Sequence, residues 1–307
     1  MGEEIHCKQL KATYSEKNGV LSVSKETDLD LSDGYHIKIV QIGIRIITVS
    51  NDNEVNARKL YAILTLIERL LMLFDGKFFT MQEMKFAESQ NDANRLDSYA
   101  INLKRSRLSY FESDSTYSFI NSICSYDEVL TADLYEKWVK LVEELDISHQ
   151  VYLYSMSANG TPVDLKVAFL IELAEPLVEL VKKKTGMFQS LSQGVTGTTL
   201  KKCLCELIKE FGTVIFSEEM RVNEDRFLQI LVNSRVRIMH IKKSQNKPYL
   251  NGAESIFYIM KISMMYRYVL LTILGIDDNI MVEQIKKITN ILDTHDDTLR
   301  NLLLKIR

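Results

Sequence analysis

The sequence is poor in cysteine, and this shortage excludes a disulfide-rich fold. Four cysteines in 307 residues are too few and too unevenly spaced for a disulfide framework. Cys203 and Cys205 are two residues apart in "KKCLCELIKEF", where a helix turns their side chains about 200° from each other. Zinc pairs have a wider spacing and a second pair elsewhere. We therefore expect reduced thiols, as in a cytoplasmic protein.

Histidine is also scarce, and this argues against a metal-dependent hydrolase. The doublet His295-Asp296 in "THDDTLR" is typical of metal-dependent phosphohydrolases, which need several further His and Asp ligands on other helices. The chain has five histidines, and they are scattered: His6, His36, His149, His240 and His295. "GVTGTTLKK" lacks the glycine-lysine spacing of a phosphate-binding loop. No metal and no cofactor are expected.

The chain has neither a strong net charge nor a long uninterrupted hydrophobic run. Its 38 basic and 41 acidic residues give a net charge of −3, so any polyanion site must be a local patch. "MGEEIHCKQL" lacks the apolar core of a secretory signal. The most apolar stretch, "SIFYIMKISMMYRYVLLTILGI", is broken by Lys261 and Arg267 and falls short of about 18 charge-free residues. We expect a buried helix, no membrane contact and a cytoplasmic location.

What is present is typical of a folded protein, with 46% hydrophobic and 26% charged residues. The first third mixes strands with one long helix. Alternating or β-branched runs predict strands at "GVLSVS", "YHIKIVQIGIRIITVS", "FFTMQEMKFAES" and "RSRLSYFES", with "ETDLDLSDG" as a turn. "NDNEVNARKLYAILTLIERLLMLFDGK" opens with Asn and Asp, which favour helix N-termini, and then shows helical apolar spacing.

From Leu130 onward the pattern becomes helical. Helices are predicted over 132–146, 163–184, 198–212, 223–243, 252–275 and 281–307, with polar or glycine-containing joints between them. The predicted fold class is therefore α+β. A mixed α/β domain over residues 1–147 is followed by an all-α helical bundle over residues 148–307, with the boundary between residues 145 and 160.

A basic segment in the helical part raises the question of function. "LVNSRVRIMHIKKSQNKPYL", residues 231–250, surrounds His240 with cations and contains no acidic residue. The cations are Arg235, Arg237, Lys242, Lys243 and Lys247. The segment is either a solvated helix face or a site for an anion. The absence of acidic residues favours RNA contact, because phosphate binding gains from released counterions.

Arg235 and His240 form the chemically specific part of this segment. The spacing alone is unspecific, since 13 arginines and five histidines produce such pairs by chance. Residues five apart on an ideal helix point about 140° from each other, so the two side chains converge only near a helix end or across a partner chain. An arginine holds phosphate and stabilises developing negative charge, and an imidazole transfers protons at neutral pH. With the substrate's 2′-hydroxyl as nucleophile, such a pair cleaves RNA and not DNA.

The same residues resemble a known family. "ILVNSRVRIMHIKK", then "LNGAESIFYIMKISMMYRYVLLTILGI" and the upstream "FLIELAEPLVELV" resemble the HEPN domain of the ApeA-like group of bacterial anti-phage proteins. The likeness is a helix ending in Arg-x4-6-His, a loop, and a Gly-x-Glu start (Gly252, Glu254) to a long apolar helix. The N-terminal region is similar to the region that precedes this domain in the same group.

The resemblance implies an activity and partners. It implies a HEPN helical bundle that pairs as a homodimer and brings two Arg-His pairs into one cleft. It also implies a metal-independent endoribonuclease that leaves a 2′,3′-cyclic phosphate and a 5′-hydroxyl. Such relatives act as toxins or abortive-infection effectors with tRNA among their common targets, which makes a phage-derived activator a further expected partner. Carried over by position, Arg235 holds the phosphate and His240 transfers the proton, while Arg237, Lys242, Lys243, Lys247 and Asn233 are candidate RNA-binding residues.

Three departures from the family pattern are visible, and the first of them, Val236, keeps a second interpretation open. Val236 follows the motif arginine where relatives usually have a polar residue, and Asn233 or Ser234 is a candidate replacement. Lys242 occupies the place of the tyrosine that a nucleotidyltransferase antitoxin modifies in some relatives. The N-terminal region is also shorter than in typical relatives. The alternative is therefore a non-catalytic HEPN module that binds RNA or protein.

Overall fold

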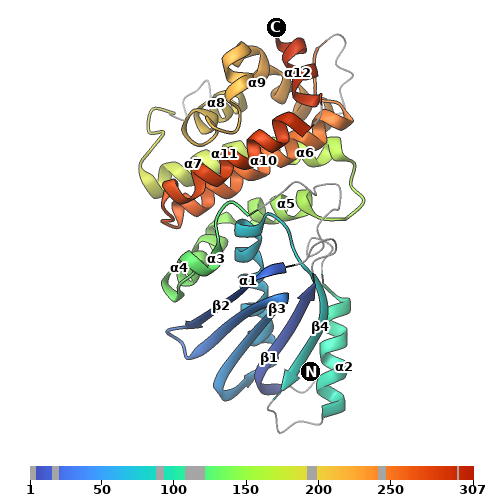
Figure 1. Ribbon diagram of the computed structural model, residues 1–307, viewed down its shortest axis with the longest axis vertical. Helices are drawn as coiled ribbons and strands as arrows, with labels where there is room; N and C mark the ends of the chain where they lie inside the picture. Colours follow the sequence, from blue (N-terminus) through green and yellow to red (C-terminus); the bar gives the residue numbers. More distant parts are fainter. Residues whose placement is uncertain are drawn as a thin grey trace. The chain divides into compact units, whose positions relative to one another are not determined.

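The computed structural model describes residues 5–15, 21–87, 93–107, 122–191, 199–240, 247–295 and 297–307. These residues form two compact units (Figure 1). Unit 1 takes its residues from 1–72, 78–112 and 125–141, and unit 2 from 73–77, 113–124 and 142–307. An antiparallel sheet in unit 1 and helices in unit 2 confirm the α+β class. The division into domains 1–147 and 148–307 stays a prediction.

The sheet of unit 1 has four strands in the order β2-β3-β1-β4, each antiparallel to its neighbours. The strands are β1 (His6–Ser15), β2 (Leu21–Asp30), β3 (Tyr35–Asn56) and β4 (Thr80–Ala87). Between Tyr35 and Val49 of β3 every second residue except Gly43 is buried, as at Ile37, Ile39, Ile47 and Val49. This period of two is that of a strand with one face in the core.

Several predictions for this unit need correction. The strand β1 was missed, and β2 continues to Asp30 through part of the predicted acidic turn. The helix predicted to open at Asn51 begins only at Ala57, because β1 pairs with β3 as far as Asn56 and holds the polar residues in the strand. The predicted strand at 105–113 begins on the last residue of a helix, α2 (Ala93–Arg105), and its part beyond residue 107 lies outside the described residues.

The helix α1 (Ala57–Asp75) supplies much of the apolar core of unit 1. Leu60, Leu64, Ile67 and Leu71 are buried at spacings of four, three and four residues, which places them along one helix face. The indole of the fully buried Trp138 donates to the Leu66 carbonyl at 2.9 Å. Trp138 lies on α4 (Ala132–Leu145), so this hydrogen bond joins α4 to α1.

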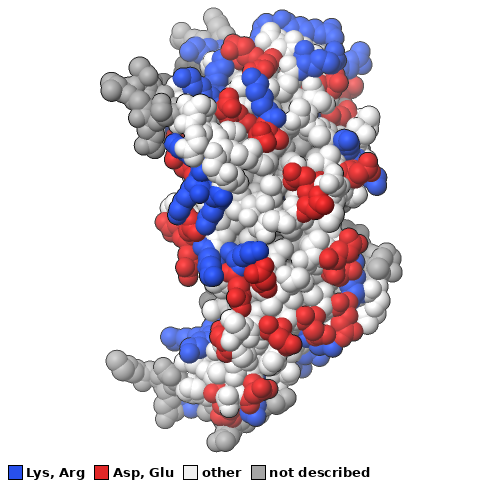
Figure 2. All heavy atoms as spheres, turned by 90° about the vertical axis from the view of Figure 1, so that its left-hand side faces the viewer, with Lys and Arg blue, Asp and Glu red and all other residues white. Residues whose placement is uncertain are grey.

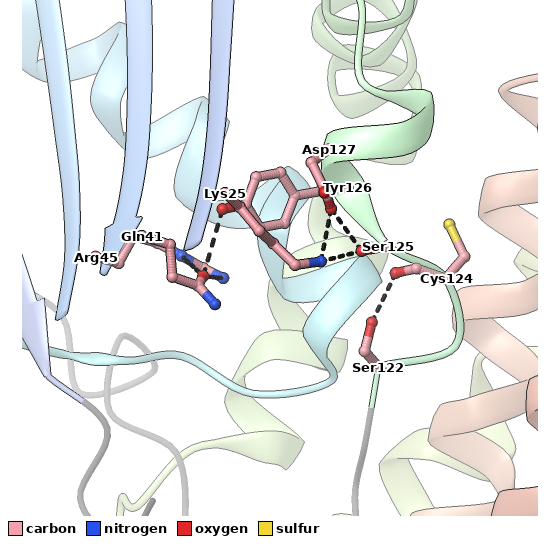
Figure 3. A network of polar contacts seen from close by, with 8 residues as sticks. All are labelled: Lys25, Gln41, Arg45, Ser122, Cys124, Ser125, Tyr126 and Asp127. Atoms are coloured by element: carbon pink, nitrogen blue, oxygen red, sulfur yellow. Dashed lines mark hydrogen bonds and ion pairs between the residues drawn. The ribbon is translucent and has the colours of Figure 1, made fainter. Parts of the chain in front are cut away.

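A polar network joins the sheet to the short helix α3 (Tyr126–Val129) (Figure 3). The side-chain oxygen of Gln41 accepts from Arg45 Nη2 at 2.7 Å and from the Tyr126 hydroxyl at 3.3 Å. The Lys25 ammonium pairs with Asp127 at 2.6 Å. Both Gln41 and Arg45 are buried, so satisfied polar groups fix the position of α3 on the sheet.

Unit 2 is built around α10 (Gly252–Ile273), which packs among the other helices of the unit. Its neighbours include α5 (Ile147–Met156), α6 (Val163–Glu172), α7 (Ala174–Thr185), α8 (Leu200–Phe211), α9 (Ser217–Met239), α11 (Asp278–His295) and α12 (Thr298–Ile306). Figure 1 shows α10 running through the middle of these helices. By length and composition alone α10 is the one described helix that could cross a membrane, and 83% of its most apolar window is buried inside the protein. The residues predicted to form a buried helix are therefore core residues.

The two charged residues within α10 have internal partners. Lys261 is fully buried between Glu219 and Asp293, with both Nζ–O distances at 2.8 Å. Arg267 is 1% exposed and donates to the carbonyls of Leu73 and Phe74, each at 2.7 Å. These contacts explain how charged residues are accommodated in the core of unit 2, since buried charges need partners.

The helix predictions for unit 2 were right in type and wrong at some joints. The predicted helix 163–184 is two helices, α6 and α7, because Pro176 has no N–H to continue the α6 hydrogen-bond ladder. The predicted helix 281–307 is also two, and α12 begins after Asp297, a residue type favoured at helix starts. The helix α5 was missed in the segment taken as the domain boundary.

Candidate functional site

The site lies at the C-terminal end of α9 (Ser217–Met239). The helix buries Phe227, Leu228, Ile230 and Leu231 and packs against α6. His240 is the C-cap residue, with φ −105° and ψ 4°. The backbone there has left the helix, so the His240 side chain is released from the 140° offset that an ideal helix imposes.

Arg235 and His240 meet within one chain at this helix end. Arg235 Nη1 lies 3.0 Å from His240 Nε2, and His240 is exposed. A guanidinium donates and never accepts, so a direct hydrogen bond between the two side chains uses the lone pair of Nε2. A ring nitrogen of His240 thus lies beside the permanent cation of Arg235.

A carboxylate that the sequence prediction did not assign completes the arrangement. Glu172, the last residue of α6, accepts from Arg235 Nε and, at 2.7 Å, from Nη2. This ion pair raises the pKa of Arg235. Glu172 thus occupies one edge of the guanidinium and leaves Nη1 directed at His240. The position of Glu172 in the segment "FLIELAEPLVELV", which resembles the family, was the one sequence feature that could have indicated a role for it. The packing of α6 on α9 is needed to reveal that Glu172 pairs with Arg235.

Asn233 and Ser234 lie in the core of the site and anchor the chain that returns after His240. The Asn233 amide donates to the Pro248 carbonyl at 3.0 Å, and the backbone N–H of Leu250 donates to the Ser234 hydroxyl at 2.8 Å. Asn233 is 7% exposed. Its observed contacts are therefore with the segment 247–250 and with Gln229.

The other candidate RNA-binding residues are divided by their positions. Arg237 stacks its guanidinium over the Tyr249 ring, 3.7 Å from the centroid, a favourable cation–π geometry. Lys247 is exposed on the returning segment. Lys242 and Lys243 lie outside the described residues. Arg237 and Lys247 therefore give this end of α9 a positive surface beside the Arg235–His240 pair.

Metal-binding residues do not gather in the described parts of the chain, where no group of three or more His, Cys, Asp or Glu side chains is placed to hold an ion. On the face of the molecule in Figure 2 basic and acidic side chains are interspersed, and basic ones gather at the upper end. This mixed distribution accords with the small net charge of −3.

The geometry defines a class of protein: a helical domain that carries an Arg-x4-His pair at the end of a helix. Residues 166–280 match the family model described as Apea-like HEPN. This span contains Glu172, Arg235, His240 and all of α10, so this part of the chain is an Apea-like HEPN domain. No curated protein and no solved structure matches the chain.

Proposed function

We propose that the protein is a metal-independent endoribonuclease of anti-phage defence, with Arg235 and His240 as its catalytic residues. The observation that carries the proposal is the exposed 3.0 Å contact between Arg235 Nη1 and His240 Nε2. It supports the proposal because it places a phosphate-binding cation beside a proton acceptor on the surface of a HEPN domain. HEPN domains are a class suited to RNA cleavage or RNA binding.

The chemistry follows from these two groups. In the substrate complex the phosphate takes Arg235 Nη1 away from His240, which frees Nε2. The 2′-hydroxyl of RNA then gives its proton to His240 Nε2, and the 2′-oxygen forms a bond to the adjacent phosphorus. The bond from phosphorus to the 5′-oxygen breaks, leaving a 2′,3′-cyclic phosphate and a 5′-hydroxyl. Arg235 Nη1 stabilises the negative charge that develops on the phosphoryl oxygens. Glu172 keeps the guanidinium in place and touches neither substrate nor product.

The leaving 5′-oxygen needs a proton, and a homodimer supplies a second group for this purpose. In a cleft between two copies, His240 of one copy accepts the first proton and His240 of the other, in its protonated form, donates the second. Met239, which is 39% exposed beside His240, is an apolar side chain suited to such an interface. We further propose tRNA as a target, a phage component as activator, a cytoplasmic location, and growth arrest as the effect.

A second candidate is a non-catalytic HEPN module that binds RNA or a partner protein. Two observations favour it. Glu172 already occupies the Nε–Nη2 edge of Arg235, one of the two edges through which arginine makes bidentate contacts with phosphate. Val236 is also apolar where relatives have a polar residue after the motif arginine.

Growth and RNA-end mapping in bacteria distinguish the two candidates. Cells express the wild type, Arg235→Ala or His240→Ala, with and without phage, and RNA ends that carry 5′-hydroxyls are sequenced. Arg221→Ala is the matched control, because Arg221 lies on the same helix, is exposed, and pairs only locally with Glu218. New ends with the wild type and the control, absent from both other variants at equal protein levels, support the ribonuclease. Identical RNA ends in all four strains would refute the ribonuclease and favour the non-catalytic binding module.

A further inference from the structure

An open groove of about 600 Å³ lies in unit 2 beside the residues described above. It is lined by the α9 residue Arg226, by Lys247, Pro248, Tyr249 and Asn251 of the segment before α10, and by Leu304 and Lys305 of α12. No acidic residue lines it. The cleavage chemistry proposed for Arg235 and His240 does not use this groove, so its charge calls for another explanation.

The positive charge of the groove is only partly neutralised by the protein. Lys305 pairs with the buried carboxylate of Glu254 at 2.6 Å, which accounts for one of the three cations. Arg226 donates to the backbone oxygen of Arg307 at 3.1 Å. Lys247 is exposed and has no ion-pair partner among the described residues. The charge of Lys247 therefore faces the groove without a described partner, and Arg226 adds a second guanidinium at its wall.

An aromatic ring and an exposed leucine lie among these cations. Tyr249 is half-buried, and its ring is stacked by the Arg237 guanidinium 3.7 Å from the centroid. Leu304 is 60% exposed. Cations that follow a phosphate backbone, together with an aromatic ring on which a base stacks, are the combination that binds single-stranded nucleic acid.

The groove and the Arg235–His240 pair are connected along α9. Arg226, Asn233 and Arg237 are seven and four residues apart, so they share one face of the helix, and the segment 247–250 packs along that face through Asn233 and Arg237. From Arg226 to Arg235 the helix rises about 14 Å at 1.5 Å per residue and turns by about 180°. The rise alone corresponds to roughly four nucleotides at a stacked spacing of about 3.4 Å, and a strand that leaves the groove must also pass around the end of α9 to reach Arg235.

We infer that this groove binds an unpaired stretch of RNA, with a base on Tyr249 and phosphates on Lys247 and Arg226, a few nucleotides from the phosphate at Arg235. The inference rests on the proposed function for the identity of the ligand as RNA. It adds a requirement that the proposed chemistry does not contain, namely that the RNA be single-stranded on one side of the cleavage point. A duplex keeps its bases stacked inside and offers none to Tyr249.

The test measures binding without cleavage. Full-length protein carrying His240→Ala is titrated into fluorescein-labelled twelve-nucleotide oligo(U) and oligo(A), and fluorescence anisotropy is followed at several salt concentrations. Adding Tyr249→Leu weakens binding about tenfold, as expected when base stacking is lost. Adding Lys247→Gln lowers the slope of log K against log salt by about 0.7, the value for one phosphate contact on a single strand. Lys286→Gln, an exposed lysine on α11 outside the groove, leaves both quantities unchanged.

A duplex of the same length separates base stacking from general attraction, because its affinity does not depend on Tyr249. The inference is overturned if Tyr249→Leu and Lys247→Gln bind single strands as the parent does, or if both duplex and single strand lose affinity equally. Binding of a protein partner in place of RNA, abolished by the same variants, also overturns it. Failure of the proposed function gives a different result. If RNA binding depends on Tyr249 but the wild type produces no cleavage, the inference about the groove stands and the proposed nuclease activity is refuted.

Discussion

Glu172 provides a sharp test of how Arg235 is held. Two substitutions weaken the contact between Glu172 and Arg235 to different degrees. Glu172→Gln keeps one oxygen acceptor for the guanidinium, and Glu172→Ala removes both hydrogen bonds. The pair is partly exposed, with 22% of the Arg235 side chain and 36% of the Glu172 side chain accessible. Exposed ion pairs contribute about 0.2–1 kcal/mol, so we expect the free energy of unfolding to change by less than about 1 kcal/mol.

Activity is expected to change far more than stability. When Glu172 is removed the guanidinium is free to turn, and a misplacement of about 1 Å costs up to about a hundredfold in rate. We expect kcat for RNA cleavage to fall about tenfold in Glu172→Gln, equivalent to about 1.4 kcal/mol of barrier, and roughly a hundredfold in Glu172→Ala. KM changes little, because the charge of Arg235 remains. Single-turnover cleavage of a labelled RNA measures the activity, and thermal unfolding of the same preparations measures the stability.

Glu175→Gln is the matched control, because Glu175 is an exposed carboxylate whose charge also acts on Arg235 but which makes no hydrogen bond to it. It should cleave at the wild-type rate. Wild-type kcat in both Glu172 variants would refute the positioning role. Faster cleavage in Glu172→Ala would also refute it and would show that Glu172 blocks Arg235 from the phosphate.

Three further predictions concern the folded units. Lys261→Met leaves the fully buried Glu219 carboxylate without its cation, so the free energy of unfolding measured in urea should fall by about 3–5 kcal/mol; a loss below 1 kcal/mol would contradict this. Burial raises the pKa of Asp293 above 3.8, so its folded form holds a proton that the unfolded form releases, and stability should decline as pH rises from 3.8 through the raised pKa. Asp293→Asn should remove that part of the decline, and an unchanged pH profile would refute the assignment. Burial raises the pKa of the Cys7 and Cys203 thiols to about 11, so alkylation at neutral pH should report unfolding of units 1 and 2 separately; fast labelling of either native thiol would be inconsistent with its burial.

Local patterns determined how much of this architecture was predictable. The uninterrupted apolar periodicity of 252–275 identified α10, and the alternation in 35–50 identified most of β3. The strand β1 was not recognisable, because a register shift between Cys7 and Gln9 interrupts the alternation of its buried residues. The segment becomes a strand by pairing with β3 and β4. The start of α1 was misplaced for the same reason, since pairing to β1 overrides the helix-cap preference of Asn and Asp.

The candidate site was predicted in part. The Arg-x4-His spacing identified Arg235 and His240, and the requirement for a helix end matches the position of His240 at the end of α9. Glu172 is 63 residues away along the chain, and a carboxylate at the end of an apolar helix has no local feature that marks it as a partner of Arg235. Asn233 appeared suited to RNA contact, but its role in holding Pro248 depends on where the chain returns after residue 246, which no local pattern encodes.

The most direct test of the account uses purified protein and RNA in the presence of EDTA. Wild type and His240→Ala, matched for folding by circular dichroism, are incubated with tRNA and with short single-stranded RNAs, and the chemistry of the new ends is determined. The account predicts that the wild type alone produces 2′,3′-cyclic phosphates and 5′-hydroxyls, and that a 2′-deoxy substitution at the mapped position abolishes the cut. Equal cleavage by His240→Ala, or a cut that survives the 2′-deoxy substitution, would contradict it.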